Sequence, residues 1–233
     1  DDPDGMAGNL EALPAGPRAG HILFRDAAQS IGRVPVDFRR LNASFLSGSA
    51  HKLGGPKGVG VLVVRDGTSL APALRGGGQE MGRRSGTENV VGIAGFGAAA
   101  EAAERDLEAG VWDRVEKLRN ILEETLAGAA PGTIFIGHDA PRLPNTSCFA
   151  TPGWKGETQV MQMDLAGFAV SAGSACSSGK VRESRVLRAM GFDAVAASSA
   201  IRVSIGPTTT EAEVVAFADV WTKHHRRWRA KAA

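Results

Sequence analysis

The sequence predicts an α/β fold, and three observations support that prediction. Short apolar runs alternate along the chain with longer segments of helical periodicity, which is the pattern of α/β proteins. The first two apolar runs are followed by polar residues, at the end of the strand where open α/β sheets bind ligands. Glycine is frequent, at 30 of 233 residues, and much of it is clustered, which indicates close approaches of the backbone rather than a flexible chain.

The N-terminal part is predicted to be a small group of strands connected by loops. Residues 1–20 have the composition of a loop, being acidic at first and then rich in Gly and Pro. Apolar or β-branched runs at 21–24, 43–46 and 59–64 predict three strands. A glycine-rich loop is expected at 76–86.

Helices and strands alternate through the rest of the chain. An alanine-rich helix is predicted at 89–106, and a second helix carries Val115, Leu118, Leu122 and Leu126 on one face. The elements predicted after it are strands at 133–136 and 146–150, a helix at 157–165, a strand at 168–170, a helix at 183–190 and a strand at 200–205. Thr210 and Glu213 form a capping box that opens a last helix through about Trp221.

We expect two domains, at residues 1–100 and 101–233, with the helical stretch 89–126 as the bridge between them. The net charge of +2 gives no reason to expect nucleic acid as a partner. The basic tail at 223–231 is interpreted most simply as a solvated helix end that complements the helix dipole.

Composition also carries expectations about location. No apolar run approaches the roughly 20 residues of a membrane span, and no signal peptide is visible at the start, so no membrane association is expected. Two cysteines are too few for a disulfide framework, which favours a reducing, cytoplasmic compartment. No metal site is predicted.

Asp26 and Lys52 are the first candidates for chemistry, because each comes at or after the carboxyl end of a predicted strand. A carboxylate there can hold a pyridinium nitrogen, and a lysine can form a Schiff base with an aldehyde cofactor. Ser49 and His51 offer groups suited to a phosphate and a ring. Each residue alone is also consistent with a helix cap or an ordinary surface position.

The two cysteines differ in their surroundings. Cys176 lies in a run of small polar residues at 173–179, between a predicted strand and a helix, where a nucleophilic thiol has access and freedom to move. An inert turn cysteine is the alternative. Cys148 lies in a strand-like run beside Phe149 and is predicted to be a small core residue.

Arg202 lies within a predicted strand, between apolar neighbours. A guanidinium in such a place needs an anionic partner, because burying an unpaired charge is costly. A substrate carboxylate held through two hydrogen bonds would serve, and a structural salt bridge is the alternative.

Six segments, taken together and in order, resemble the cysteine desulfurases, which are fold-type-I pyridoxal-phosphate (PLP) enzymes related to class V aminotransferases. The segments are Asp26-Ala-Ala-Gln29-Ser30, Ser49-Ala-His51-Lys52 with Gly55-Pro-Lys-Gly58, Gly76-Gly-Gly-Gln-Glu80, Arg84-Ser-Gly-Thr-Glu-Asn89, Ser174-Ala-Cys176 and Ile201-Arg202-Val-Ser204. The resemblance covers nearly all of the chain after residue 20. It implies part of the large-domain sheet of that fold, followed by a smaller α+β C-terminal domain.

The resemblance also implies roles for individual residues. Lys52 would bind PLP as a Schiff base and, with His51 and Cys176, would form the catalytic set. The remaining cofactor contacts would be Asp26 to the pyridine nitrogen, Gln29 to the phenolic oxygen, Ser49 and His51 to the phosphate, and Thr87 to the phosphate of the partner subunit in a homodimer. Arg202 would bind the carboxylate of L-cysteine. Cys176 would take up the sulfur as a persulfide, release alanine, and pass the sulfur to an iron–sulfur scaffold or another acceptor protein.

The sequence also departs from the family. The family's phosphate loop and its ring-stacking histidine, which lie upstream of the Asp26 strand, have no match, so the chain alone is expected to be a poor or inactive enzyme. Arg25 stands where the family has a small or β-branched residue. Two alternatives therefore remain open: a truncated, non-catalytic dimerising or scaffold-binding module, and a selenocysteine lyase.

Overall fold

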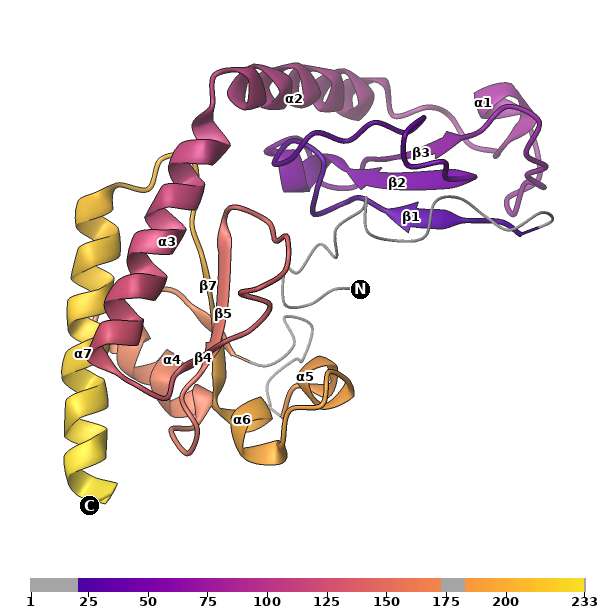
Figure 1. Cartoon of the computed structure of the whole chain (residues 1–233). Coiled ribbons are helices and arrows are strands. Elements are labelled where there is room, and N and C mark those ends of the chain that lie inside the picture. The colour runs from indigo at the N-terminus through magenta and orange to yellow at the C-terminus, as the bar shows by residue number, and fades with distance from the viewer. Residues whose placement is uncertain (1–20, 173–182, 233) are drawn as a thin grey trace. The chain divides into compact units, whose positions relative to one another are not determined.

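The structure is a computed structural model that describes residues 21–172 and 183–232, and it forms two compact units (Figure 1). The N-terminal unit ends at Ala109 and the C-terminal unit begins at Gly110. Gly110 has a φ of 69°, a left-handed conformation that glycine adopts without strain. The helical stretch expected as a bridge is therefore interrupted there.

A three-stranded sheet with the order β1-β2-β3 forms the centre of the N-terminal unit. Its strands are β1 (Phe24–Asp26), β2 (Phe45–Ser49) and β3 (Gly60–Val64). β1 and β2 are parallel, whereas β3 is antiparallel to β2. The carboxyl ends of β1 and β2 consequently lie at one edge of the sheet, which is where the predicted site residues begin.

The helical elements of the N-terminal unit come after β2 and after β3. A 3₁₀ turn, η1 (Ala50–Leu53), continues directly from β2, and α2 (Val90–Glu108) packs against it. The side chain of Asn89 caps α2 by accepting a hydrogen bond from the Gly92 amide at 3.1 Å. The short α1 (Gln79–Gly82) is irregular, because two of its residues have left-handed backbone conformations.

The core of the N-terminal unit is small. Its buried apolar cluster consists of Ala27, Leu41, Ala43 and Leu46, with partly buried neighbours around them. Alanine buries little apolar area, so this cluster contributes limited hydrophobic stabilisation.

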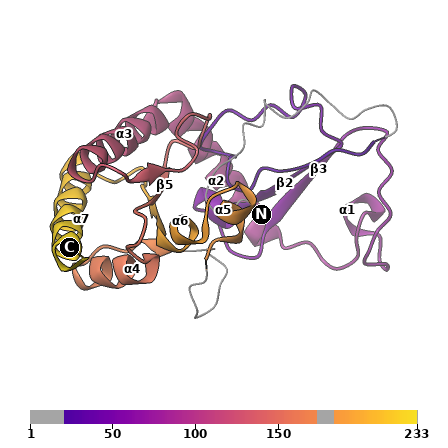
Figure 2. The same cartoon turned by 60° about the horizontal axis from the view of Figure 1, so that its bottom comes forward.

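The C-terminal unit contains a four-stranded antiparallel sheet in the order β4-β5-β7-β6. The strands are β4 (Ile134–Phe135), β5 (Thr146–Ala150), β6 (Ser171–Ala172) and β7 (Ala200–Ser204). The helices are α3 (Val111–Ala129), α4 (Gly156–Leu165), α5 (Arg185–Ala189), α6 (Ala194–Ser199) and α7 (Glu211–Ala232). The long helix α7 contacts both α3 and α4 (Figure 2).

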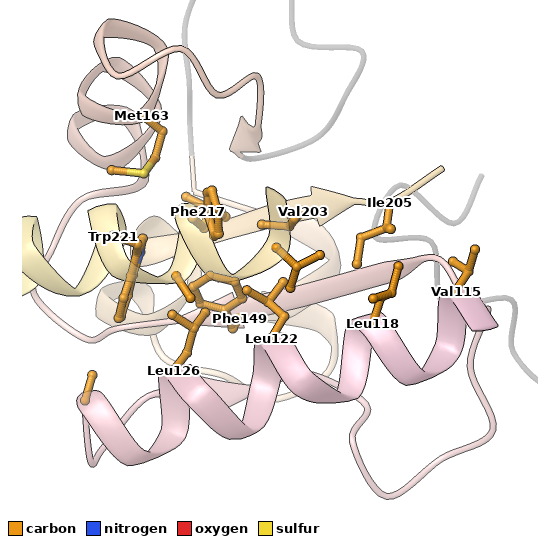
Figure 3. Close-up of a cluster of buried hydrophobic side chains, with 14 of the residues drawn as sticks. Val115, Leu118, Leu122, Leu126, Phe149, Met163, Val203, Ile205, Phe217 and Trp221 are labelled. Carbon is orange, nitrogen blue, oxygen red and sulfur yellow. The ribbon is translucent and has the colours of Figure 1, made fainter. Parts of the chain in front are cut away.

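A large apolar core joins this sheet to α3 and α7 (Figure 3). Leu122 and Leu126 project from α3 toward Phe149 of β5, and Leu118 projects from the same face of α3 toward Ile205. Trp221 of α7 is fully buried, and its ring meets Phe149 edge-on at a centroid distance of 5.6 Å. Its indole Nε1 donates a hydrogen bond to Gln159 Oε1 at 3.0 Å, so the polar end of the ring is satisfied.

The predicted α/β class is confirmed, and several elements match closely. β5 has the predicted bounds, and the capping box is formed, since Glu213 Oε2 accepts from the Thr210 amide at 2.8 Å. Other elements differ from the prediction. α1 and α6 were not predicted, β1 lies at 24–26 instead of 21–24, α7 continues to Ala232 instead of ending near Trp221, and β6 lies at 171–172 instead of 168–170. The extension of α7 follows from packing, because His225 and Trp228 beyond Trp221 join the aromatic cluster around Trp154.

Candidate cofactor site

Asp26 ends β1 and is held in place by two hydrogen bonds. Ser47 of the neighbouring strand donates its hydroxyl to Asp26 Oδ1 at 2.8 Å, and the Ala28 amide donates to the same oxygen at 3.0 Å. Ser47 is the register partner of Asp26 in β2. The second oxygen, Oδ2, accepts no hydrogen bond from the described residues, and the side chain is exposed. Asp26 is thus an oriented carboxylate with one oxygen open to a ligand.

Ser49, His51 and Lys52 lie one strand away, at the same edge. Ser49 Oγ and His51 Nδ1 are 2.8 Å apart and share a hydrogen bond. Lys52 lies in η1 and is half-buried. The turn closes on Gly54, whose φ of 85° lets its amide bond back to the Ala50 carbonyl. A hydroxyl, an imidazole and an amine therefore emerge within four residues of one another.

Arg33 connects the two halves of this edge and was not predicted from the sequence. Its guanidinium donates to the Gln29 carbonyl and, through Nη2 at 3.0 Å, to the Lys52 carbonyl. Burial lowers the pKa of Arg33. Arg33 links the turn that carries Gln29 to the turn that carries Lys52. An arginine in a turn, without a motif around it, gives no sequence signal for such a role.

Thr87 lies in an exposed loop whose backbone is fixed by Arg84 and Gln79. Arg84 Nη1 donates to the Gly86 carbonyl at 2.6 Å, and Gln79 Oε1 accepts from the Gly86 amide at 3.1 Å. Glu80 and Met81, nearby, have φ values of 51° and 56°, which are strained for residues other than glycine. Strain of this kind is concentrated at functional loops.

Arg25, which precedes Asp26, projects to the other face of the sheet. Arg25 is buried, with 4% of its surface exposed, and its Nε has no hydrogen-bond partner among the described residues. Burial lowers the pKa of Arg25. Arg25, which departs from the family pattern, therefore has a buried charge with incomplete hydrogen bonding.

The remaining predicted residues belong to the C-terminal unit or lie outside the described residues. Arg202 is half-buried in β7, where its register partners are Cys148 in β5 and Ser171 in β6. Cys148 is buried, as predicted. Cys176 lies outside the described residues. The structure thus brings five predicted residues to one sheet edge: Asp26, Gln29, Ser49, His51 and Lys52.

The donor set at this edge fits a phosphorylated pyridine aldehyde. Such a ligand needs an amine, an anion near its ring nitrogen, and hydroxyl or imidazole groups for its phosphate. The described residues hold no cluster of three His, Cys, Asp or Glu side chains that suits a metal ion. In the same described part of the chain, no helix is long and apolar enough to cross a bilayer.

The α/β fold and the residues at this sheet edge are typical of enzymes that bind a cofactor at strand ends. Comparison with known proteins identifies the family. Residues 7–217 match the family model "Aminotransferase class-V", and the chain belongs to that family. Curated relatives include a cysteine desulfurase of Cereibacter sphaeroides, which is 45% identical over 84% of this chain and 50% of its own length. The cysteine desulfurase NifS of Azotobacter vinelandii is 42% identical, over 84% of this chain and 48% of its own.

Solved structures agree with the sequence relatives. A NifS-like protein from Rickettsia africae superposes with a TM-score of 0.78 at 32% identity, over 87% of this chain and 53% of that one. A second NifS-like protein gives a TM-score of 0.76 at 36% identity, over 88% and 52% of the two chains. The fold-type-I resemblance is therefore confirmed. The chain spans about half the length of the relatives that it matches.

Proposed function

We propose that this chain carries the lysine, the sulfur-accepting cysteine and the substrate arginine of a cysteine desulfurase. The observation that carries the proposal is the gathering of Asp26, Ser49, His51 and Lys52 at one edge of a parallel strand pair. Relatives named cysteine desulfurase support the choice of reaction.

The proposed cofactor is pyridoxal 5′-phosphate, which supplies an electron sink for the carbon next to the substrate amine when it is bound. Lys52 would hold its aldehyde carbon through the side-chain amine, and Asp26 would keep its ring nitrogen protonated through the open Oδ2. Ser49 and His51 would contact the phosphate, and Gln29 the phenolic oxygen. Arg33 would fix the distance between the Gln29 and Lys52 turns through its two carbonyl contacts.

The proposed chemistry of the substrate is a sulfur transfer. Arg202 would bind the carboxylate of L-cysteine through charge-assisted hydrogen bonds. The Cys176 thiolate would attack the substrate sulfur, so that an S–S bond forms as the Cβ–S bond breaks. The electron pair of the broken bond stays on Cβ, which takes up a proton to give alanine. The persulfide on Cys176 would then pass to an iron–sulfur scaffold or another acceptor protein.

We also propose that the chain works as a homodimer, with Thr87 reaching the cofactor of the partner subunit. Exposed apolar side chains flank Thr87 in sequence. They are Leu74, Met81, Val90 and Val91, and Val91 is 84% exposed. Apolar groups gathered around a predicted cofactor contact are typical of an association surface.

The experiment adds PLP to the purified chain, reduces the complex with borohydride and maps the modified peptide. The pyridoxyl group is expected on Lys52, and its appearance on Lys57 would refute the assignment. Lys52→Ala is the control, and it should lose the label and the yellow colour together.

A second assay measures alanine formation from cysteine and from selenocysteine. Cys176→Ser should keep cofactor binding and lose sulfur release, whereas Cys148→Ser should change the rate little. Because the chain alone is expected to turn over poorly, the discriminating result is cofactor binding: a chain that associates but neither turns yellow with PLP nor forms alanine would favour the non-catalytic module. A chain that prefers selenocysteine and needs no Cys176 would favour the lyase.

A further inference from the structure

The last two turns of α7 carry an unusual concentration of positive charge. Between 223 and 231 the helix has five cations and no carboxylate; they are Lys223, Arg226, Arg227, Arg229 and Lys231. All five are exposed, and none forms an ion pair with any described residue. The net charge of the whole chain is only +2, so the rest of the chain is net negative.

The helix dipole accounts for only part of this charge. Its influence falls off within the last turn, where Arg229 and Lys231 lie. Lys223, Arg226 and Arg227 come earlier and share a face, because positions three and four apart are neighbours on a helix. Like charges at this spacing destabilise a helix. The surrounding charge is also felt by His224, whose pKa is lowered by burial and then by Arg227 and Lys223.

The opposite face of the same turns is anchored firmly in the core. Trp221 and His225 stack with their rings 5.3 Å apart and nearly parallel. Trp228 stacks on Trp154 at 5.8 Å and 13°. The backbone beneath the cations is therefore held by aromatic packing, which presents them as a preorganised surface rather than a loose tail.

We propose that this basic face, comprising Lys223, Arg226, Arg227 and Lys231, is a docking surface for an acidic polypeptide. Its occupant is a protein segment, such as a helix, with carboxylates spaced to meet the cations. The cations have no partner within the described chain and repel one another, so an anionic surface of complementary charge would relieve this repulsion.

The structure favours an acidic polypeptide over the other anionic surfaces. Bases of single-stranded nucleic acid need exposed aromatic platforms, and Trp228 is already stacked on Trp154. A membrane-surface helix needs an apolar face free to enter lipid, and the apolar face of α7 is buried in its own core. The proposal is independent of the sulfur chemistry, since it concerns a surface and no catalytic residue.

The test measures the binding of a labelled helical peptide with glutamates four residues apart to the 233-residue chain by fluorescence anisotropy. Its glutamine counterpart is the matched ligand. Arg226→Glu with Arg227→Glu should weaken binding of the glutamate peptide by about tenfold or more, and raising the salt from about 50 mM to about 300 mM should weaken it too. Arg39→Glu with Arg105→Glu is the control. Both residues are exposed and outside α7, so the same change in net charge should leave the affinity within about twofold.

Three outcomes would overturn the proposal. They are no binding of the glutamate peptide at low salt, equal weakening by the control pair, and tighter binding of a short DNA duplex or of anionic lipid vesicles than of the peptide. Arg226→Gln with Arg227→Gln removes the two charges without reversing them. If circular dichroism shows unchanged helix content in this variant, weaker binding reflects loss of the basic face and not misfolding of α7.

Discussion

The two units of this protein differ in how much apolar surface each buries in its own core. The C-terminal unit closes a four-stranded sheet with α3 and α7 over a core that contains Phe149, Trp154 and Trp221. The N-terminal unit has a three-stranded sheet, a core made largely of alanine and leucine, and exposed Phe24, Met81 and Val91. Nevertheless, it is the N-terminal unit that gathers Asp26, His51 and Lys52. The larger apolar core and the proposed cofactor contacts therefore lie in different units of the chain.

The largest effect should come from the aromatic core. Trp221→Ala should lower the free energy of unfolding of the C-terminal unit by about 3–5 kcal/mol, because it leaves a cavity and removes the partner of Gln159. Phe24→Ala should cost less than about 1 kcal/mol, since that ring is 54% exposed. Urea unfolding checks both variants. Equal losses would mean that the two units are packed equally well.

A buried ion pair provides the next test. Glu123 accepts two hydrogen bonds from Arg142, at 2.8 Å and 2.9 Å, and one from Ser147 at 2.6 Å. Glu123→Gln should cost about 3 kcal/mol, because it leaves the Arg142 charge buried without its partner. Glu116→Gln is the control. Glu116 is exposed, and its buried partner Arg119 keeps hydrogen bonds to Asn120 and to the Leu143 carbonyl, so the loss should be less than about 1 kcal/mol.

The same pair predicts a pH dependence. Burial opposes the ionisation of Glu123, but the hydrogen bonds and charges of its partners outweigh burial and hold the pKa below its ordinary value. The stabilisation is therefore present at neutral pH and is lost as the pH falls below about 4.5. Glu123→Gln should reduce this acid loss. An unchanged acid slope in the variant would assign the loss to other carboxylates.

The N-terminal unit should respond to one substitution in the opposite direction. Arg25→Val removes a buried guanidinium whose Nε has no partner in the part of the chain that the structure describes, and it should raise the free energy of unfolding by about 1–3 kcal/mol. Thermal unfolding of the two forms gives the comparison. Destabilisation would show that the Arg25 side chain is better satisfied than its neighbours indicate.

The smallest effect on stability is expected at the exposed apolar surface. Val91→Lys should change the free energy of unfolding by less than about 0.5 kcal/mol, because the side chain is 84% exposed. It should nevertheless weaken the self-association proposed above, which sedimentation measures. An unchanged association state would place the dimer contact elsewhere.

Sequence periodicity was enough to predict an element where one face of it, or all of it, is buried. The apolar run 146–150 predicted β5, and the single apolar face of 115–126 predicted α3. The capping box of Thr210 and Glu213 predicted the start of α7. The positions of strand ends predicted Asp26, Ser49, His51 and Lys52 as candidates for a cofactor site, and the family resemblance added Gln29. Such motifs consist of residues close together in the sequence, so they can be recognised without knowing how the chain packs.

Contacts between distant residues were decided by the tertiary structure alone. Arg33 reaches the carbonyls of both Gln29 and Lys52, and Arg142 reaches Glu123 across 19 positions of sequence. α7 runs past Trp221 because Trp228 finds Trp154, a residue on a separate loop. The order of β7 between β5 and β6 likewise has no local signal. The sequence by itself determined which side chains are candidates for the proposed chemistry. Packing determined which side chains meet, because such contacts depend on where the whole chain buries its apolar surface.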